Sequence, residues 1–197
     1  MYFDLNIPVA SPFDRQAREK LSLILYRLSQ CDKQVVAALN YTLETNGDIK
    51  KLPAKIDPPV SYPNLTVLHR VTIQTDGSIA KVDWTRLDQE FDLVAMRTSN
   101  RDTFEEACDL SLLDIVSLDT KERLAFDITA QSMEKARGHG IFFELCYAPG
   151  IRETTNRSYL YQLGMALSKC SQKEHLLVSS EAESVSEIRH PFDVFYL

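Results

Sequence analysis

The residues best suited to chemistry follow an apolar run near the carboxyl end of the sequence. The run Ile141–Tyr147 is almost entirely large and apolar, with Glu144 as the exception, which is typical of a strand covered on both faces. Pro149 and Gly150 end this strand, and helical spacing resumes over Arg152–Lys169. The turn between them carries Arg152, Glu153, Thr154, Thr155, Asn156 and Arg157. Hydrogen-bond donors therefore gather at a helix N-terminus, a place that favours an anion.

Other polar side chains end other predicted strands and would share a rim with this turn. In parallel α/β folds, the loops that follow strand C-termini carry the ligand chemistry. The predicted phosphate-contacting set comprises Arg97, Arg152, Arg157, Ser179 and Ser180. Tyr147 stands beside them and is suited to stacking on a base or bonding a phosphate. The alternative for such arginines is solvation or pairing with acids.

A long polar segment, Thr42–Pro63, interrupts the alternation of strands and helices. It holds four prolines together with Lys50, Lys51 and Lys55. Its charge alone suggests RNA contact, and a solvated loop is the alternative interpretation.

Acidic side chains near predicted strand ends offer a second kind of chemistry. Asp4, Asp119 and Glu144 could direct carboxylates into a barrel mouth for acid–base or metal-assisted hydrolysis. The alternative for Glu144 is a buried partner for an arginine. No GxGxxG, P-loop or GxSxG motif occurs, and the histidines have no metal-ligand spacing: His69, His139, His175 and His190. We expect neither a metal nor a cofactor on this chain.

Composition indicates one reduced, soluble domain over residues 1–197. The net charge of -6 argues against a uniformly basic nucleic-acid binder, so any phosphate-binding face must be local. The cysteines are widely spaced without a CxxC pair: Cys31, Cys108, Cys146 and Cys170. The first residues have no basic leader and include Asp4 and Asn6, so we expect neither a signal peptide nor a membrane contact.

Strand-like and helical segments alternate along most of the sequence. The predicted strands are Tyr2–Ile7, Val35–Tyr41, Leu65–Ile73, Leu93–Arg97, Ile115–Leu118, Ile141–Tyr147, Leu176–Ser179 and a possible last one at Val194–Leu197. The predicted helices are Asp14–Ser29, Asn100–Leu110, Ser132–Arg137, Arg152–Lys169 and Ala182–Arg189. This order favours an α/β fold with a parallel sheet closed into a TIM-barrel-like (β/α) barrel, and an open doubly wound sheet is the alternative.

An ordered set of short motifs resembles the thirty-kilodalton protein subunit family of ribonuclease P and ribonuclease MRP, with its archaeal counterpart. The matching pieces are Tyr2–Pro8, Phe91–Ala95 with Arg97, Asp114–Asp119, Phe143–Tyr147 with Ile151 and Arg152, Val178–Ser180 and Glu187–Arg189. They span nearly the whole chain. Family members usually continue beyond Asp193–Val194, so a missing tail is expected here.

The resemblance implies a noncatalytic RNA-binding and assembly role. In that family the RNA, using Mg²⁺, removes 5′ leaders from precursor tRNA, and the MRP particle processes rRNA. It implies a smaller Pop5-like partner subunit and a nuclear, nucleolar location. The family is distantly similar to barrels of the polymerase and histidinol phosphatase type, whose first strand carries His-x-His where this chain has Asp4 and Asn6. A metal-dependent phosphoesterase using Asp4, Asp119 and Glu144 is the alternative function.

Overall fold

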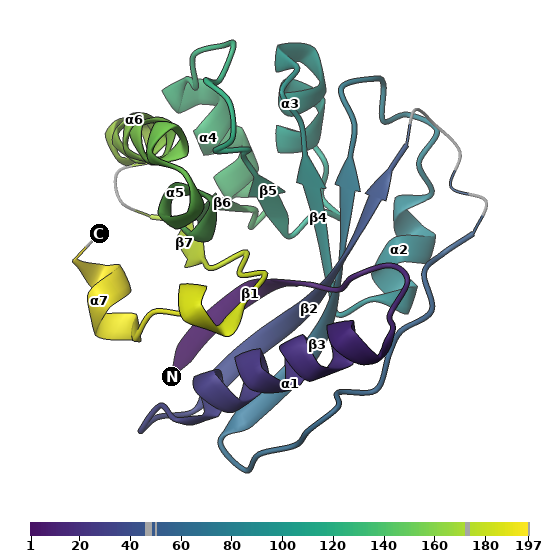
Figure 1. Cartoon of the computed structure of the whole chain (residues 1–197). Coiled ribbons are helices and arrows are strands. Elements are labelled where there is room, and N and C mark those ends of the chain that lie inside the picture. Colours follow the sequence, from purple (N-terminus) through teal and green to yellow (C-terminus); the bar gives the residue numbers. More distant parts are fainter. Residues whose placement is uncertain (46–48, 50, 172–173, 197) are drawn as a thin grey trace.

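Seven parallel strands form one sheet whose strand order follows the chain from β1 to β7. The computed structural model describes residues 1–45, 49, 51–171 and 174–196. The strands are β1 (Tyr2–Pro8), β2 (Val35–Glu44), β3 (Leu65–Gln74), β4 (Leu93–Arg97), β5 (Ile115–Ser117), β6 (Phe142–Cys146) and β7 (Leu176–Ser179). Figure 1 shows the sheet curling into a nearly closed barrel with helices outside it. The predicted TIM-barrel-like fold is confirmed, and the open sheet was wrong.

Helices follow most of the strands and cover the outside of the barrel. They are α1 (Arg15–Ser29), α2 (Trp84–Glu90), α3 (Arg101–Cys108), α4 (Ala130–Gly138), α5 (Ala148–Arg152), α6 (Thr154–Cys170), the 3-10 turn η1 (Val185–Glu187) and α7 (Pro191–Phe195). Side-chain caps begin several of them: Asp14 accepts from the Ala17 N–H at 2.8 Å, and Asn100 accepts from the Asp102 N–H at 2.9 Å. Among the described residues, no helix is both long and apolar enough to span a membrane.

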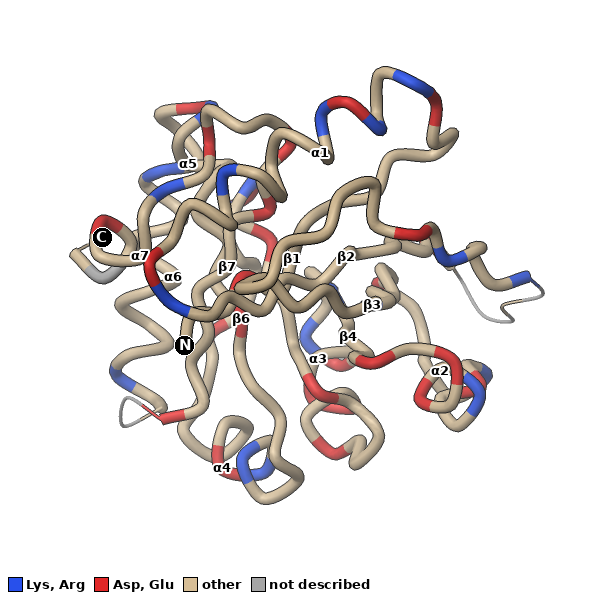
Figure 2. Tube along the Cα trace, turned by 90° about the horizontal axis from the view of Figure 1, so that it is seen from below, with Lys and Arg blue, Asp and Glu red and all other residues tan. Residues whose placement is uncertain are grey.

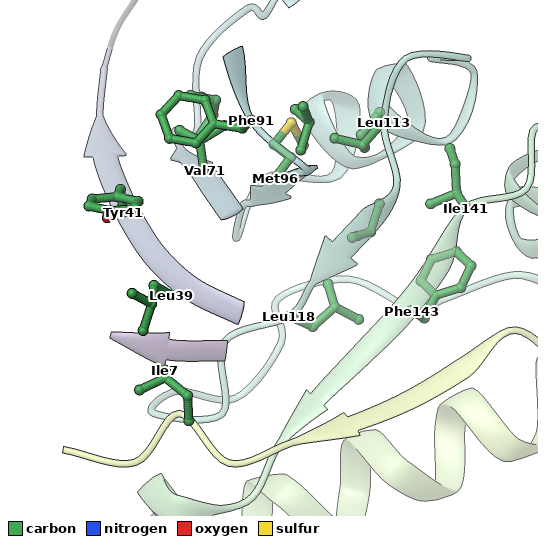
Figure 3. Packing of buried hydrophobic residues seen from close by; sticks show 14 of the residues in the cluster. Ile7, Leu39, Tyr41, Val71, Phe91, Met96, Leu113, Leu118, Ile141 and Phe143 are labelled. Atoms are coloured by element: carbon green, nitrogen blue, oxygen red, sulfur yellow. The ribbon is translucent and has the colours of Figure 1, made fainter. Parts of the chain in front are cut away.

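The two faces of the sheet differ in polarity. Residues two apart share a face of a strand, and one face carries the apolar core. Val71, Val94 and Val116 belong to this core and are fully buried against the helices. Figure 3 shows part of the same layer, including Leu39, Met96 and Phe143. The alternate positions point into the barrel and are largely polar: Asn40, Arg70, Thr72, Arg97, Ser117 and Glu144.

The barrel closes between β7 and β1 through two hydrogen bonds that we call the seam. The Ser180 N–H donates to Asp4 Oδ1 at 2.9 Å, and the Glu181 N–H donates to the Asn6 carbonyl at 3.0 Å. These bonds come from the loop after β7. They hold the two outermost strands together where the sheet has no continuous ladder.

Two predictions about local structure were wrong. Residues 194–196 of the predicted strand Val194–Leu197 are not a strand, because Pro191 begins a short helix that His190 caps through its side chain, and Leu197 lies outside the described residues. Of Ala182–Arg189, only Val185–Glu187 is helical, as a single 3-10 turn. In addition, α2, a seven-residue helix that buries Trp84 and Leu87, was not predicted from the sequence.

Candidate nucleic-acid interface and the barrel interior

A buried ion pair occupies the centre of the barrel. The guanidinium of Arg70 on β3 meets the carboxylate of Glu144 on β6 in a bidentate pair, with N–O distances of 2.6 and 2.8 Å. Both side chains are fully buried. Arg70 also donates to the Leu5 carbonyl at 2.8 Å, so its charge is well satisfied. The alternative interpretation of Glu144 as a partner for a buried arginine is therefore confirmed.

Three neutral side chains extend this pair into a closed hydrogen-bond ring. Asn6 Nδ2 donates to Glu144 Oε2 at 3.1 Å, and Asn40 Nδ2 donates to Asn6 Oδ1 at 2.7 Å. Thr72 Oγ1 donates to Asn40 Oδ1 at 2.7 Å and accepts from Arg70 Nε at 3.0 Å. The ring links β6, β1, β2 and β3. A buried polar network of this kind is stable because each of its members has a partner.

Burial and bonding set the protonation of two carboxyl groups, that of Glu144 in the ring and that of Asp4 in the seam. Burial opposes ionisation of Glu144, but the charge and hydrogen bonds of Arg70 outweigh burial and lower the pKa of Glu144 to about 2. Asp4 has no such cation. Burial raises the pKa of Asp4 to about 6, although the Ser180 N–H partly opposes that rise. One carboxylate is thus held ionised, whereas the other titrates near neutral pH.

The three acids of the phosphoesterase alternative do not form a metal-binding group. Glu144 is committed to Arg70, and Asp119 accepts from the Lys121 N–H at 2.8 Å. Among the described residues, one group of three potential ligands has its ligand atoms within 4.8 Å of one another, and it consists of Cys31, Asp32 and His190. Asp4 takes part in the seam, and Asn6 takes part in the seam through its carbonyl and bonds Glu144 and Asn40 through its side chain.

Two of the three predicted rim arginines are engaged with acids. Arg97 is only 6% exposed and forms a bidentate pair with Glu181 at 2.7 and 3.1 Å. Arg152 pairs with Glu187 at 2.9 Å and with Glu183 at 3.3 Å. Their charges are locally neutralised, so both arginines hold the loop after β7 in place.

Arg157 remains the exposed cation of this rim. It lies in the first turn of α6, and its Nε donates to the Gly150 carbonyl at 3.1 Å. None of the ion pairs among the described residues involves Arg157. Its remaining guanidinium nitrogens can therefore reach an external anion.

The other predicted contact residues differ in accessibility. Tyr147 is 4% exposed, and its hydroxyl accepts from the Arg189 N–H at 3.1 Å. Ser179 and Ser180 are also buried. Lys51 is exposed, whereas Lys55 donates to the Glu90 carbonyl at 2.6 Å and lies 5.6 Å from the centre of the Phe91 ring. Lys50 lies outside the described residues.

The open end of the barrel beside β2 to β5 is acidic. A cavity of about 500 Å³ lies there, and its lining includes Glu44, Asp76, Arg97 and Asp119. Asp76 accepts from the Thr98 hydroxyl at 2.9 Å, one of several bonds that keep its pKa below the ordinary value although burial opposes them. Figure 2 shows acidic and basic positions interspersed around the fold. A phosphate is therefore disfavoured in this cavity.

Sequence reasoning missed Arg70, the residue on which the interior depends. Its signal was present, because Arg70 is a charged residue in the middle of the apolar strand Leu65–Gln74. A charge at such a position requires a partner of opposite sign on a neighbouring strand. Glu144, the single acid in the apolar run of β6, is that partner.

Comparison with known proteins decides the family. The family model described as RNase P subunit p30 matches residues 1–197. The chain belongs to the RNase P subunit p30 family.

The relatives of the chain are distant in sequence. The chain is 27% identical over 165 residues to the probable ribonuclease P protein subunit 3 of Schizosaccharomyces pombe, covering 81% of this chain and 68% of that protein. It is 33% identical over 104 residues to the ribonuclease P protein subunit p30 of Mus musculus, covering 53% of this chain and 39% of that protein. The chain is 28% identical over 109 residues to protein GAMETOPHYTE DEFECTIVE 1 of Arabidopsis thaliana, covering 55% of this chain and 19% of that protein.

A solved structure supports the fold. The chain superposes on one chain of a cryo-EM structure of archaeal Ribonuclease P with mature tRNA, with a TM-score of 0.65 and 16% sequence identity. The match covers 98% of this chain and 80% of that chain. The barrel architecture is thus shared over essentially the whole sequence.

Proposed function

We propose that this chain is a noncatalytic, RNA-contacting protein subunit of ribonuclease P and of ribonuclease MRP. In this role it supports RNA-catalysed removal of 5′ leaders from precursor tRNA, and rRNA processing in the MRP particle. The p30 family match over residues 1–197 supports membership of such a particle. The expected setting is the nucleus and nucleolus, with a Pop5-like subunit as a partner and Mg²⁺ bound by the RNA.

The hydrogen-bond ring is the observation that carries the noncatalytic part of this proposal. A barrel hydrolase needs carboxylates or histidines free to bind metal or transfer protons at the open end of the barrel. Here the Glu144 carboxylate pairs with Arg70, and the Asn6 side chain bonds Glu144 and Asn40. The Asp4 carboxylate accepts from the Ser180 N–H in the seam. These side chains therefore stabilise the fold and are not free to bind a metal or to transfer a proton.

The RNA contact is assigned to the accessible cations. Arg157 and Lys51 are exposed, and a bidentate guanidinium suits a phosphate. Arg97 and Arg152 act indirectly, since their pairs with Glu181, Glu183 and Glu187 hold the loop after β7. This division reconciles a net charge of -6 with an RNA partner.

Salt-dependent binding to ribonuclease P RNA tests the contact. Arg157→Ala should reduce the slope of log K against log salt by about 0.7 to 0.9, the value expected for one lost phosphate contact. Lys20→Ala, which removes an exposed cation on the outside of α1, is the matched control and should leave the slope unchanged. An unchanged slope in Arg157→Ala would remove this residue from the interface.

A second assay tests the absence of catalysis. The purified chain is incubated with a phosphodiester substrate and added Mn²⁺ or Zn²⁺, beside Asp4→Asn. We expect no turnover from either protein. Metal-dependent turnover that Asp4→Asn abolishes would instead establish the phosphoesterase.

A further inference from the structure

A wide apolar groove runs along the outside of the barrel across β7 and β1. It lies between α1 and α6, with α7 at its edge (Figure 1), and encloses about 1080 Å³. Arg97, Arg152 and Arg157 do not line it. The groove is thus separate from the accessible cations Arg157 and Lys51, although the buried residues Tyr147 and Ser180 contribute to its lining.

The groove gathers most of the exposed apolar side chains of the described structure. Eleven large hydrophobic residues are exposed, and six of them line this one groove: Phe3, Tyr161, Met165, Val178, Phe192 and Tyr196. Scattered exposed hydrophobic residues are ordinary, but a contiguous apolar patch marks an interaction site.

Comparison with the other strands indicates what is missing. The outward residues Val71, Val94 and Val116 are fully buried beneath helices, whereas Val178, an outward residue of β7, is 38% exposed. The outer face of a parallel barrel is normally covered by helices, while side chains fill the interior. The gap between α1 and α6 therefore corresponds to one uncovered helix position, and a helix about 10 Å wide suits it.

Charge around the groove indicates the chemistry of the occupant. Exposed Arg27 on α1 and exposed Lys169 on α6 stand on opposite sides, and half-buried Arg189 also contributes to the lining. Among the described lining residues, Asp4 supplies the one carboxylate, and it is buried and bonded to the Ser180 N–H. Acidic side chains along the edges of a helix would complement these cations.

We propose that this groove binds an amphipathic helix of a partner protein, with an apolar face and acidic edges. Its apolar residues pack on Phe3, Met165 and Val178, and its carboxylates face Arg27 and Lys169. A second copy of this chain suits the groove poorly, because a groove-to-groove contact would bring the two sets of cations together. Nucleic acid is disfavoured by the apolar lining.

Site-specific photo-crosslinking in the assembled complex tests the proposal. A photoreactive phenylalanine analogue replaces Met165, which is 58% exposed, and the complex is purified through a tag on this chain. The matched control places the analogue at Leu23, which is 53% exposed on α1 outside the groove. We expect position 165, and not position 23, to crosslink to a segment of another polypeptide that is amphipathic at helical spacing and carries Asp or Glu beside its apolar stripe.

The charge of the occupant is tested with that segment as a synthetic peptide. Lys169→Glu should weaken peptide binding about threefold to tenfold because an attractive exposed pair becomes repulsive. Lys20→Glu, the same change outside the groove, should have no effect. Crosslinking of position 165 to RNA, to this same chain or to nothing would overturn the proposal, as would a basic segment.

Discussion

Replacing Arg70 by Met is expected to be among the most damaging single changes to the fold. Arg70→Met keeps an unbranched apolar stem but leaves the Glu144 carboxylate without its paired guanidinium in a fully buried site. Pairing lowers the pKa of Glu144 from 4.5 to about 2, which corresponds to about 3 kcal/mol of stability at pH 7. Breaking a buried pair from one side typically costs about 3–5 kcal/mol, a large part of a total of about 5–15.

The pH dependence distinguishes this ion pair from ordinary packing. Because the folded-state pKa of Glu144 is depressed, its contribution is present above pH 4.5 and is lost as pH falls toward about 2. The variant Glu144→Gln should not show this loss of stability at acidic pH. In Arg70→Met the unpaired Glu144 carboxyl favours its protonated form. The difference in unfolding free energy between this variant and the wild type should therefore shrink as pH falls.

Urea unfolding followed by circular dichroism, repeated across pH, measures these differences. The double variant Arg70→Met, Glu144→Gln should recover about 2 kcal/mol relative to Arg70→Met alone, because position 144 then holds no unpaired buried charge. Arg15→Met removes an ion pair with Glu19 whose side chains are 92% and 63% exposed, and it should change stability by less than about 0.5 kcal/mol. A cost below about 1 kcal/mol for Arg70→Met, or no recovery in the double variant, would refute the reasoning.

Other substitutions test further features of the structure. Asp4→Asn should stabilise the protein at pH 7 by up to about 3 kcal/mol, because it removes a buried carboxylate. The raised pKa of Asp4, about 6, means that wild-type stability falls as pH rises from 3.8 through 6, which urea titrations at pH 4 and pH 7 check. Tyr147→Phe should cost about 1 kcal/mol in the same assay, because the Arg189 N–H loses its acceptor. Gly150→Ala should lower the melting temperature and cost about 1–3 kcal/mol, because the new methyl group would lie 3.1 Å from Leu160 Cδ2.

The strands were predictable because parallel strands covered on both faces form short, nearly continuous apolar runs. Each of the seven runs from Tyr2 to Ser179 became a strand with ends shifted by a few residues. The same logic failed at residues 194–196, because a short apolar run does not by itself distinguish a strand from a helical segment. It also missed α2, whose seven residues bury only Trp84 and Leu87.

The candidate site was predictable only in outline. Strand-end placement identified Arg97 and Arg152, but whether an arginine is free depends on acids far away in the sequence. Glu181 lies 84 residues after Arg97 and Glu187 lies 35 residues after Arg152, with no local pattern linking them. Which arginine stays accessible is therefore a property of the fold, and Arg157 could not be separated from the others by sequence.

The seam also has a consequence for how the chain folds. Its bond between Ser180 and Asp4 joins residues 176 positions apart, so it can form only after a very long loop has closed. The neighbouring pair β2 and β3, in contrast, aligns Val35 with Leu65 over a short separation. Contacts of such long range generally form late, so a weakened seam should speed unfolding and leave the refolding rate almost unchanged. The rate at which the seam opens would then set the lifetime of the native state.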